Sequence, residues 1–284
     1  MTANSIKNRY DFVFLFDVKD GNPNGDPDQA NLPRVDAENQ EGLITDVCIK
    51  RKVRNYVQIK YNLVKPNDIF IRQGNILAPI IDGAEGKTIQ ERQASLCKDY
   101  FDTRAFGAVM SVGEKGAGTV RGPVQFTFSR SEDRIYQAEH SITRCAVTTE
   151  KEAKAQENRE NASTFGRKST VPYALYCMHG FVSAVDAQKS GFSEEDLNLL
   201  WEALSNAFEH DRAAARGEMT KRRLIVFKHV GDAPHLGSAR SSELFDKVQI
   251  TKNTDLPRSW SDYNVSSLEE IKNNLPQGVE VFEK

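Results

Sequence analysis

The sequence predicts an α+β fold with the element order strand, helix, strand, strand, helix, strand. Two segments repeat apolar residues at three- and four-residue spacing, as amphipathic helices do. Short runs rich in aromatic and branched residues recur between them, as buried strands require. Long polar or glycine-rich stretches separate these elements, so we expect large insertions in one domain. The expected strands are residues 9–18, 122–130, 172–185 and 221–230.

The first helix is expected to begin after Thr45, which is a good N-cap with Asp46 behind it, and to cover 46–61. Its two faces differ in character. The face that we expect to be buried carries Ile49, Val53, Tyr56, Val57 and Lys60. The opposite face carries a basic stripe, where a loop and a helix N-terminus favour phosphate. Its members are Lys50, Arg51, Arg54 and Gln58. A solvated surface is the alternative interpretation.

The second helix begins at a capping-box-like pair, Ser193 and Asp196, and its apolar stripe runs from Leu197 to Phe208. We expect this helix to end at Gly217. With the insertions set aside, the order of elements is the ferredoxin-like plan that RNA-recognition folds use. A fold by itself licenses no function.

The remaining segments are an insertion, a hairpin arm and a C-terminal extension. The insertion should contain a strand near 69–72, a helix over 88–104 and a glycine-rich loop. The arm has strand-like ends and a polar, charged tip that is not expected to pack on the core. The extension should contain a strand at 242–250 and a short helix after Ser266. The expected divisions are 1–61 with the loop 19–44, 62–120, 121–137, 138–171 and 172–284.

Composition leaves the partner open. The chain of 284 residues has 38 Lys and Arg against 40 Asp and Glu, a formal net charge of −2. A near-neutral total is compatible with polyanion binding, because a local basic stripe attracts phosphate. The four cysteines are far apart and match no disulfide or zinc spacing. The apolar run at 12–16 is too short for a signal peptide or a membrane span, so we expect a cytoplasmic protein.

An acidic loop follows the first strand. Residues 20–26 have the spacing of the first seven positions of a calcium-binding EF-hand loop, but position twelve is Asn31 instead of a bidentate Glu. Consecutive turns, or amides of Asn22 and Asn24 presented to a polar ligand, are the other interpretations. A nuclease-type metal site would need several carboxylates to gather in space. Its candidates are Asp17, Asp20, Asp26 and Asp36.

Gly86-Lys87-Thr88 is similar to the end of a phosphate-binding P-loop. The first glycine of that motif should stand at position 81, where the sequence has Ile81, so the loop could not wrap a phosphate closely. The five histidines are scattered outside any hydrolase or metalloprotease motif. These patterns favour a protein that is not an enzyme and has no cofactor.

The arm carries a second group of cations. Arg144 lies on one side of the predicted hairpin, and Arg167 and Lys168 lie on the other, with Phe165 beside them as a possible stacking surface. The expected sheet strands lack the aromatic pattern with which RNA-recognition folds stack bases, so we expect contacts with the nucleic-acid backbone. A third basic group, partly paired with neighbouring acids, is Arg212, Arg216, Lys221, Arg222 and Arg223.

Long motifs carry a family resemblance over nearly the whole chain. They are GNPNGDPD followed by Asn31, Pro33, Arg34 and Asp36, then GLITDVCIKRKVRNYV, DTRAFGAV, GTVRGPVQ, HSITR, FGRKSTVPYALY, DRAAARGEM and LPQGVEV. In these residues the sequence resembles the CRISPR-associated backbone subunit of type I-C Cascade, in the Cas-seven superfamily. It departs from the family at 37–40 and in the alanine run 213–215, which affects local contacts.

The resemblance implies a hand-like protomer with an RNA-recognition-like palm, a finger insertion and a thumb hairpin. Several copies would stack head to tail along the spacer of a guide RNA, and each thumb would kink the RNA and turn out a base. The other bases would stay free to pair with target DNA. The implied further partners are the guide-handle-binding, large and small subunits of Cascade.

The resemblance also implies which residues hold the RNA. The first helix and its preceding loop map to Asn22, Asn24, Arg34, Lys50, Arg51 and Arg54, and the thumb maps to Arg144, Phe165, Arg167 and Lys168. Such binding would be non-catalytic and independent of sequence, because Lys and Arg neutralise phosphates without reading bases. Related backbone subunits of other CRISPR types cut RNA, so a metal-dependent RNase that uses the acidic loop is the alternative.

Overall fold

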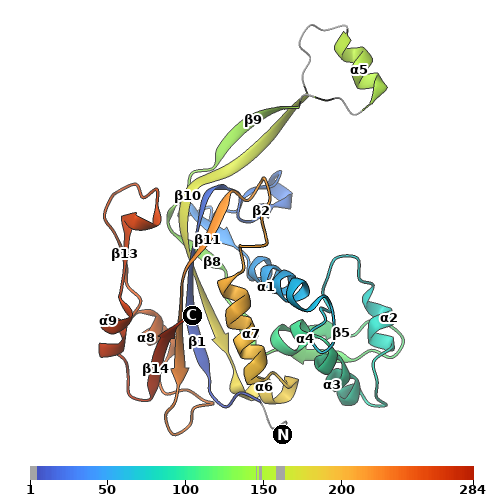
Figure 1. Ribbon diagram of the computed structural model, residues 1–284, viewed down its shortest axis with the longest axis vertical. Helices are drawn as coiled ribbons and strands as arrows, with labels where there is room; N and C mark the ends of the chain where they lie inside the picture. Colours follow the sequence, from blue (N-terminus) through green and yellow to red (C-terminus); the bar gives the residue numbers. More distant parts are fainter. Residues whose placement is uncertain (1–4, 145, 147–148, 158–163) are drawn as a thin grey trace.

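An eight-stranded antiparallel sheet forms the centre of the protein (Figure 1). The computed structural model describes residues 5–144, 146, 149–157 and 164–284. The sheet order is β14 (Val279–Glu283), β11 (Glu218–His229), β1 (Tyr10–Gly21), β10 (Thr164–Val182), β8 (Ser129–Arg134) and β4 (Glu41–Ile44). Two further strands, β7 (Val124–Phe126) and β9 (Ala138–Arg144), pair with β10. The chain therefore has a mixed α/β fold with a mainly antiparallel sheet, as expected.

Strand β1 lies in the middle and is buried on both faces. Phe12, Phe14 and Phe16 point into one apolar cluster, and Val13 and Leu15 point into the other. This alternation explains why the strand is a continuous apolar run, since both of its faces must avoid water. β1 pairs with β10 from Tyr10↔Val182 to Gly21↔Val171. The sheet thus has a core on each side.

Helices cover the first face of the sheet, and the C-terminal extension covers the second (Figure 1). The first face holds α1 (Asp46–Tyr61), α6 (Ala184–Ser190) and α7 (Glu194–Ser205). The second holds α8 (Ser241–Phe245), β12 (Ile250–Lys252), the 3-10 turn Trp260–Asp262, β13 (Tyr263–Val265) and α9 (Leu268–Asn273). Within the described ranges, none of the helices has the length and apolar character needed to cross a bilayer.

The two long helices were predicted well at their starts. α1 begins after Thr45 and covers the expected residues. α7 has the expected capping box of Ser193 and Asp196 but ends at Ser205, well before Gly217. The strand expected at 242–250 is wrong: this segment is α8, a turn and the start of β12. Its apolar residues follow a helical spacing and pack on the second face as Leu244, Phe245 and Val248.

The insertion forms a small unit with its own core. It contains α2 (Leu77–Asp82), α3 (Ile89–Asp99), α4 (Phe101–Phe106), β5 (Gly107–Met110) and β6 (Gly118–Arg121). The core residues are Phe70, Ile81, Leu96, Tyr100, Met110 and Ala117. The strand expected near 69–72 is wrong, because the amides of Phe70 and Ile71 donate to the carboxylate of Asp102 instead of joining a sheet. The helix expected over 88–104 is interrupted at Tyr100.

The arm is a ribbon of β9 and the first part of β10, and it stands away from the body (Figure 1). β10 is one strand of 19 residues that runs from the sheet into the arm. The polar segment between β9 and β10 contains a helix, α5 (Glu150–Glu157), that the sequence analysis did not predict. Alanine, glutamate, lysine and glutamine are good helix formers, which accounts for this helix. The expected polar stretch 158–163 lies outside the described residues.

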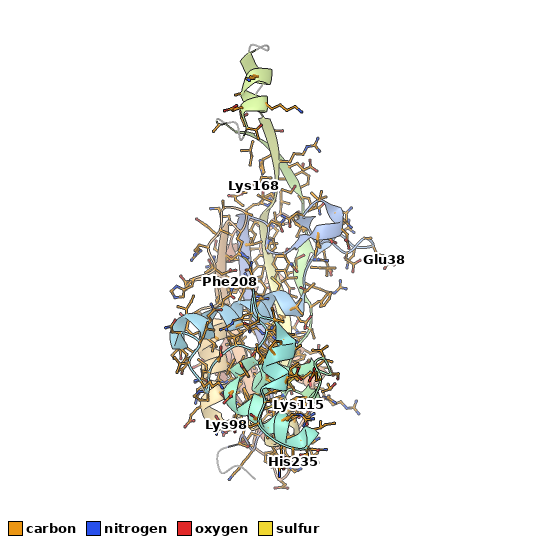
Figure 2. All side chains as sticks on the ribbon, turned by 90° about the vertical axis from the view of Figure 1, so that its right-hand side faces the viewer. Glu38, Lys98, Lys115, Lys168, Phe208 and His235 are labelled. Carbon is orange, nitrogen blue, oxygen red and sulfur yellow. The ribbon has the colours of Figure 1, made fainter. Side chains whose placement is uncertain are left out.

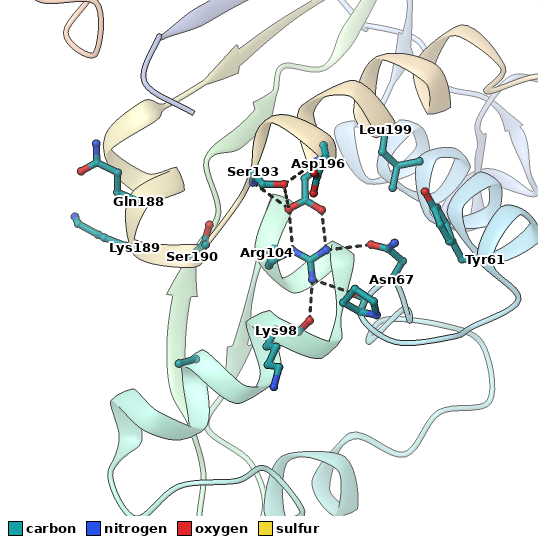
Figure 3. A pocket seen from close by; sticks show the side chains of 14 residues that line it. Tyr61, Asn67, Lys98, Arg104, Gln188, Lys189, Ser190, Ser193, Asp196 and Leu199 are labelled. Carbon is teal, nitrogen blue, oxygen red and sulfur yellow. Dashed lines mark hydrogen bonds and ion pairs between the residues drawn. The ribbon is translucent and has the colours of Figure 1, made fainter. Parts of the chain in front are cut away.

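A buried ion pair joins the insertion to α7 (Figure 3). The guanidinium of Arg104 binds Asp196 through two hydrogen bonds, of 2.7 and 3.0 Å. Its remaining N–H groups donate to the carbonyls of Pro66, Cys97 and Lys98 and to the side chain of Asn67. The pair lines a cavity of about 500 Å³ between the two parts. These contacts fix the position of the insertion on the sheet domain.

We expect Arg104→Ala to lower the free energy of unfolding by about 3–5 kcal/mol, because it leaves the buried carboxylate of Asp196 without its cation. Urea denaturation measures the loss. The control is Arg121→Ala, since Arg121 is exposed and lies 3.5 Å from Asp186; it should cost less than about 1 kcal/mol. Equal effects of the two substitutions would contradict the structural role of Arg104.

Candidate nucleic-acid interface

A backbone hydrogen bond connects the loop after β1 to the segment that precedes β11. The amide of Asn22 donates to the carbonyl of Ala215 at 2.7 Å. A Cβ at Gly21 would overlap the carbonyl oxygen of Arg216, so only glycine allows the two chains to cross this closely. The crossing fixes where the loop starts, beside the base of the arm.

Asn24 connects this loop to the start of α1. Its Oδ1 accepts hydrogen bonds from the amide of Thr45 at 3.0 Å and from the Thr45 hydroxyl at 3.1 Å. The hydroxyl of Thr45 accepts no capping bond within its own helix, although Thr45 is the N-cap residue as predicted. Asn24 thus orders the start of α1, and its carboxamide oxygen already accepts hydrogen bonds from within the protein.

Arg34 and Asp26 close a small hairpin in the same loop. The hairpin consists of β2 (Gly25–Asp26), the 3-10 turn Pro27–Gln29 and β3 (Leu32–Pro33). Nη1 of Arg34 lies 3.3 Å from Oδ2 of Asp26. Nε of Arg34 is buried and has no hydrogen-bond partner in the described part of the chain. A donor without a partner is a group that an oxygen ligand can satisfy.

The basic stripe on α1 was predicted to be an exposed surface. This prediction is wrong for two of its residues, Lys50 and Arg54. The side chains of Lys50 and Arg54 are only 13% and 11% exposed. Lys50 binds Asp46 at 2.8 Å, and Arg54 binds Asp102, which is itself 1% exposed, at 2.8 Å. Both cations also lie over the ring of Phe106. Partners from the insertion turn these residues inward.

Arg51 is the cation of this stripe that remains exposed. Its Nη1 makes a long hydrogen bond of 3.4 Å to the carbonyl of Ile71. Among the described residues it has no acidic partner within ion-pair distance. Gln58 is exposed further along the same face. The face therefore offers one available positive charge, near the loop.

Lys52 is a residue that the sequence analysis missed. It is buried and binds Asp211, which is also bound by Arg216 with bonds of 3.0 and 3.2 Å. Lys52 also lies 5.4 Å from the centre of the Phe208 ring. Its position three residues after Ile49 and beside Val53 placed it near the buried face, a signal that was available in the sequence. This cluster anchors the segment before β11 to α1.

The arm residues occupy the two paired strands of the ribbon. Arg144 pairs with Thr164, and Lys168 pairs with His140. The backbone register places positions 165 and 167 on one face of the ribbon and positions 144 and 168 on the other. The side chains of Arg144 and Phe165 lie outside the described part of the structure.

Arg167 and Lys168 are available at the base of the arm. Arg167 is largely exposed, and its closest acid, Glu139, lies 4.0 Å away. Lys168 is half-buried and, in the described ranges, has no acid within ion-pair distance. Figure 2 shows Lys168 near the base of the arm, well separated from Lys98 and Lys115 on the insertion. A phosphate at this place would compete with the carboxylate of Glu139, whose ion pair with Arg167 is long.

A small cavity brings the loop and the arm together. It has a volume of about 200 Å³. Its wall comes from the loop after β1, the base of the arm and the segment before β11. The lining residues are Asn22, Ala30, Asn31, Leu32, Glu139, Arg167, Lys168, Ser169 and Ala215. Residues predicted separately in loop and thumb thus meet in one site, whereas Lys50 and Arg54 belong to the junction with the insertion.

Three of the four carboxylates proposed for a metal site, those of Asp17, Asp26 and Asp36, are engaged by other partners. Asp17 binds Arg222 and the hydroxyl of Tyr173, although burial raises its pKa. A hydrogen bond from Arg130 lowers the pKa of Asp36. In the described ranges, no three or more acidic, cysteine or histidine side chains gather as metal ligands would. The described structure therefore gives the nuclease interpretation no geometric support.

The segment similar to a P-loop has a different structure. The apolar run before it is the helix α2, whereas a P-loop follows a strand. Its amides at Lys87 and Thr88 donate to the carboxylate of Glu91 in a capping box at the start of α3. The groups that would hold a phosphate are therefore taken by the protein itself.

The cysteine thiols within the described chain are unpaired. Burial raises the pKa of Cys97 to about 11 and that of Cys177 to about 12, and it also raises the pKa of Cys48. Such thiols are protonated at neutral pH and poor nucleophiles. Cys145 lies outside the described residues.

The third basic group is largely paired, as expected. Arg212 binds Glu209, Arg216 binds Asp211, and Arg222 binds Asp17. On the same strand, Arg223 binds Glu283, and Lys221 donates to the backbone carbonyl of Lys284. The contacts of Arg223 and Lys221 join β11 to the C-terminal strand β14 and the chain end. The base of the arm is therefore the more available positive surface.

The chain belongs to the family described as CRISPR-associated protein Cas7, whose family model matches residues 8–267. A relative, the CRISPR-associated protein Cas7 of Haloferax volcanii, is 24% identical over 225 residues. That alignment spans 70% of this chain and 65% of the relative.

Chains of two solved structures align with most of this chain. A chain of a CRISPR RNA-guided surveillance complex, pre-nicking, has a TM-score of 0.56 and 11% identity, covering 93% of this chain and 87% of that chain. A chain of another CRISPR RNA-guided surveillance complex has a TM-score of 0.48 and 12% identity, covering 93% and 81% of the two chains. At such identity the first likeness concerns the fold alone.

We expect the two arginines of α1 to differ in their effect on stability. Arg54→Met should lower the free energy of unfolding by about 3 kcal/mol, because Asp102 stays buried without its cation. Arg51→Met should change it by less than about 0.5 kcal/mol, since Arg51 is exposed. Thermal or urea unfolding of both variants measures the difference. Equal losses would show that the two side chains are not placed as described.

Proposed function

We propose that this chain is a non-catalytic backbone protomer that holds a CRISPR guide RNA without reading its sequence. The observation that carries the proposal is the meeting of two cations, Arg167 and Lys168, with the loop residue Asn22 around one cavity at the base of a projecting arm. Lysine and arginine neutralise phosphates whatever the bases are. Membership of the Cas7 family and the family resemblance support the same function.

The fold fits the hand-like arrangement that the resemblance implies. The strand order β11, β1, β10, β8, with α1 and α7 on one face, supports the proposed ferredoxin-like palm. In this proposal the unit with its own core is the finger, residues 62–120, and the ribbon is the thumb, residues 138–171. The palm consists of 1–61, 121–137 and 172–284, including the C-terminal extension.

Stacking of copies head to tail would follow from a heterologous contact, which need not close into a ring. Each copy would contribute only a few phosphate contacts, and the copies together would hold the RNA. A net charge of −2 limits repulsion between neighbouring copies. We further propose the type I-C subtype, a cytoplasmic location, assembly with the guide-handle-binding, large and small subunits, and pairing of the held guide with target DNA.

The proposed contacts differ in their roles. Arg51, Arg167 and Lys168 would bind phosphates directly, and the unpaired Nε of Arg34 would bind a further oxygen. Asn24 orders the start of α1, and Asn22 lines the cavity. Arg144 and Phe165 would contact the RNA from the thumb. Lys50 and Arg54 would contribute to the electric field near the RNA from within their ion pairs.

We expect Lys168→Glu and Arg51→Glu each to weaken binding of unrelated RNAs by about tenfold or more, because a charged contact to phosphate is lost. The slope of log affinity against log salt should fall by about 1 for each. Fluorescence anisotropy over a salt series measures both quantities.

The control is Lys272→Glu, which changes an exposed lysine of α9 by the same charge and should leave the affinity unchanged. Binding confined to one RNA sequence would contradict the proposal. So would equal losses in all three variants, because they would reflect net charge and not a local site.

We expect guide RNA bound by the protein to remain intact when magnesium is added, because binding is proposed to be non-catalytic. Gel analysis of end-labelled RNA measures this. Cleavage at regular intervals that is lost in Asp26→Ala would instead establish the metal-dependent RNase.

A further inference from the structure

Asn22 carries an acceptor that the protein leaves unsatisfied. The residue is 7% exposed, and its Nδ2 donates to the carbonyl of Asn31 at 2.7 Å. This bond fixes which way the carboxamide lies. Oδ1 is buried and has no hydrogen-bond partner among the described residues. A buried acceptor without a donor costs about 1–3 kcal/mol, so a ligand that supplies a donor gains free energy here.

The surrounding loop holds Asn22 in a strained, fixed setting. Ala30 and Asn31 both have left-handed backbone conformations, with φ of 51° and 63°, which cost energy for residues other than glycine. Asn31 packs directly against Gly25, where a Cβ would overlap its side chain. Such strain, kept by the surrounding contacts, is common where a site is ordered before its ligand binds.

The cavity limits what the ligand can be. Its volume of about 200 Å³ is several times the roughly 30 Å³ of one water molecule in the liquid, enough for a ring such as a sugar. Arg167 and Lys168 stand on its arm side and favour an adjacent phosphate. A sugar with a neighbouring phosphate is the repeating unit of a nucleic acid.

The hydrogen-bond donor that Asn22 Oδ1 lacks indicates which kind of sugar would bind in the cavity. Phosphate oxygens only accept hydrogen bonds, and the donors of the bases differ from base to base. The 2′-hydroxyl is the donor that every ribonucleotide carries, and a deoxyribonucleotide lacks it. We propose that the cavity at the base of the arm is a ribose site in which Asn22 Oδ1 accepts a hydrogen bond from a 2′-hydroxyl, so that the protein prefers RNA to DNA. This inference rests on the proposed function.

The test compares three short oligonucleotides of one sequence with the full-length protein: RNA, 2′-fluoro RNA and DNA. The 2′-fluoro group keeps the ribose-like pucker but cannot donate a hydrogen bond. We expect 2′-fluoro RNA to bind about 3- to 10-fold more weakly than RNA, the effect of one neutral hydrogen bond. In Asn22→Leu, the ratio of the affinities for RNA and for 2′-fluoro RNA should fall to about one. The unfolding midpoint of this variant checks that it folds.

The matched control is Lys168→Ala, which removes a cation from the same cavity. It should weaken RNA and 2′-fluoro RNA by the same factor and leave their ratio unchanged. Equal binding of the two oligonucleotides by the unchanged protein would overturn the ribose site while leaving RNA binding intact. A preference that follows base identity instead of the sugar would also overturn it. Failure to bind RNA at all would overturn the proposed function as well.

Discussion

The continuity of β10 is the constraint on which the rest of the structure depends. One strand of 19 residues pairs with β1 in the core and with β9 in the arm. The arm therefore leaves the sheet in a direction set by backbone hydrogen bonds, and its base lies next to the loop that starts at Gly21, because Gly21 pairs with Val171 at the same end of that pairing. The cavity between loop and arm is a geometric consequence of this register.

Ion pairs between distant segments decide which cations the surface offers. Lys50, Lys52 and Arg54 lie on one helix, yet all three are held by carboxylates and rings. The pairs of Lys52 and Arg54 reach distant segments and contribute to the correct placement of the segment before β11 and of the insertion, because breaking one leaves a buried charge. Lys50 pairs with Asp46 within α1 itself. The charges that remain available are few and local, which agrees with a protein of near-neutral total charge that could still hold a polyanion.

Local signals were enough for some elements and not for others. The start of α1 was predictable from the spacing of its apolar residues and from Thr45 as N-cap residue, although the Thr45 hydroxyl bonds to Asn24 and not within the helix. The burial of Arg54 was not, because its partner Asp102 lies 48 residues away in the insertion. The loop and arm residues were singled out from motifs, but their meeting at one cavity depends on the long-range pairing of β1 with β10. Asn22 was named as an amide, whereas its unpaired oxygen is visible only in three dimensions.

The most direct test of the account is hydrogen–deuterium exchange of the protein with and without bound RNA. The account predicts slower exchange at the loop 21–34, at the start of α1 and at the arm-base segments 138–141 and 167–170. Exchange in α2, α3, α8 and α9 should stay unchanged. Protection confined to the insertion or to the C-terminal extension, with none at the base of the arm, would contradict it.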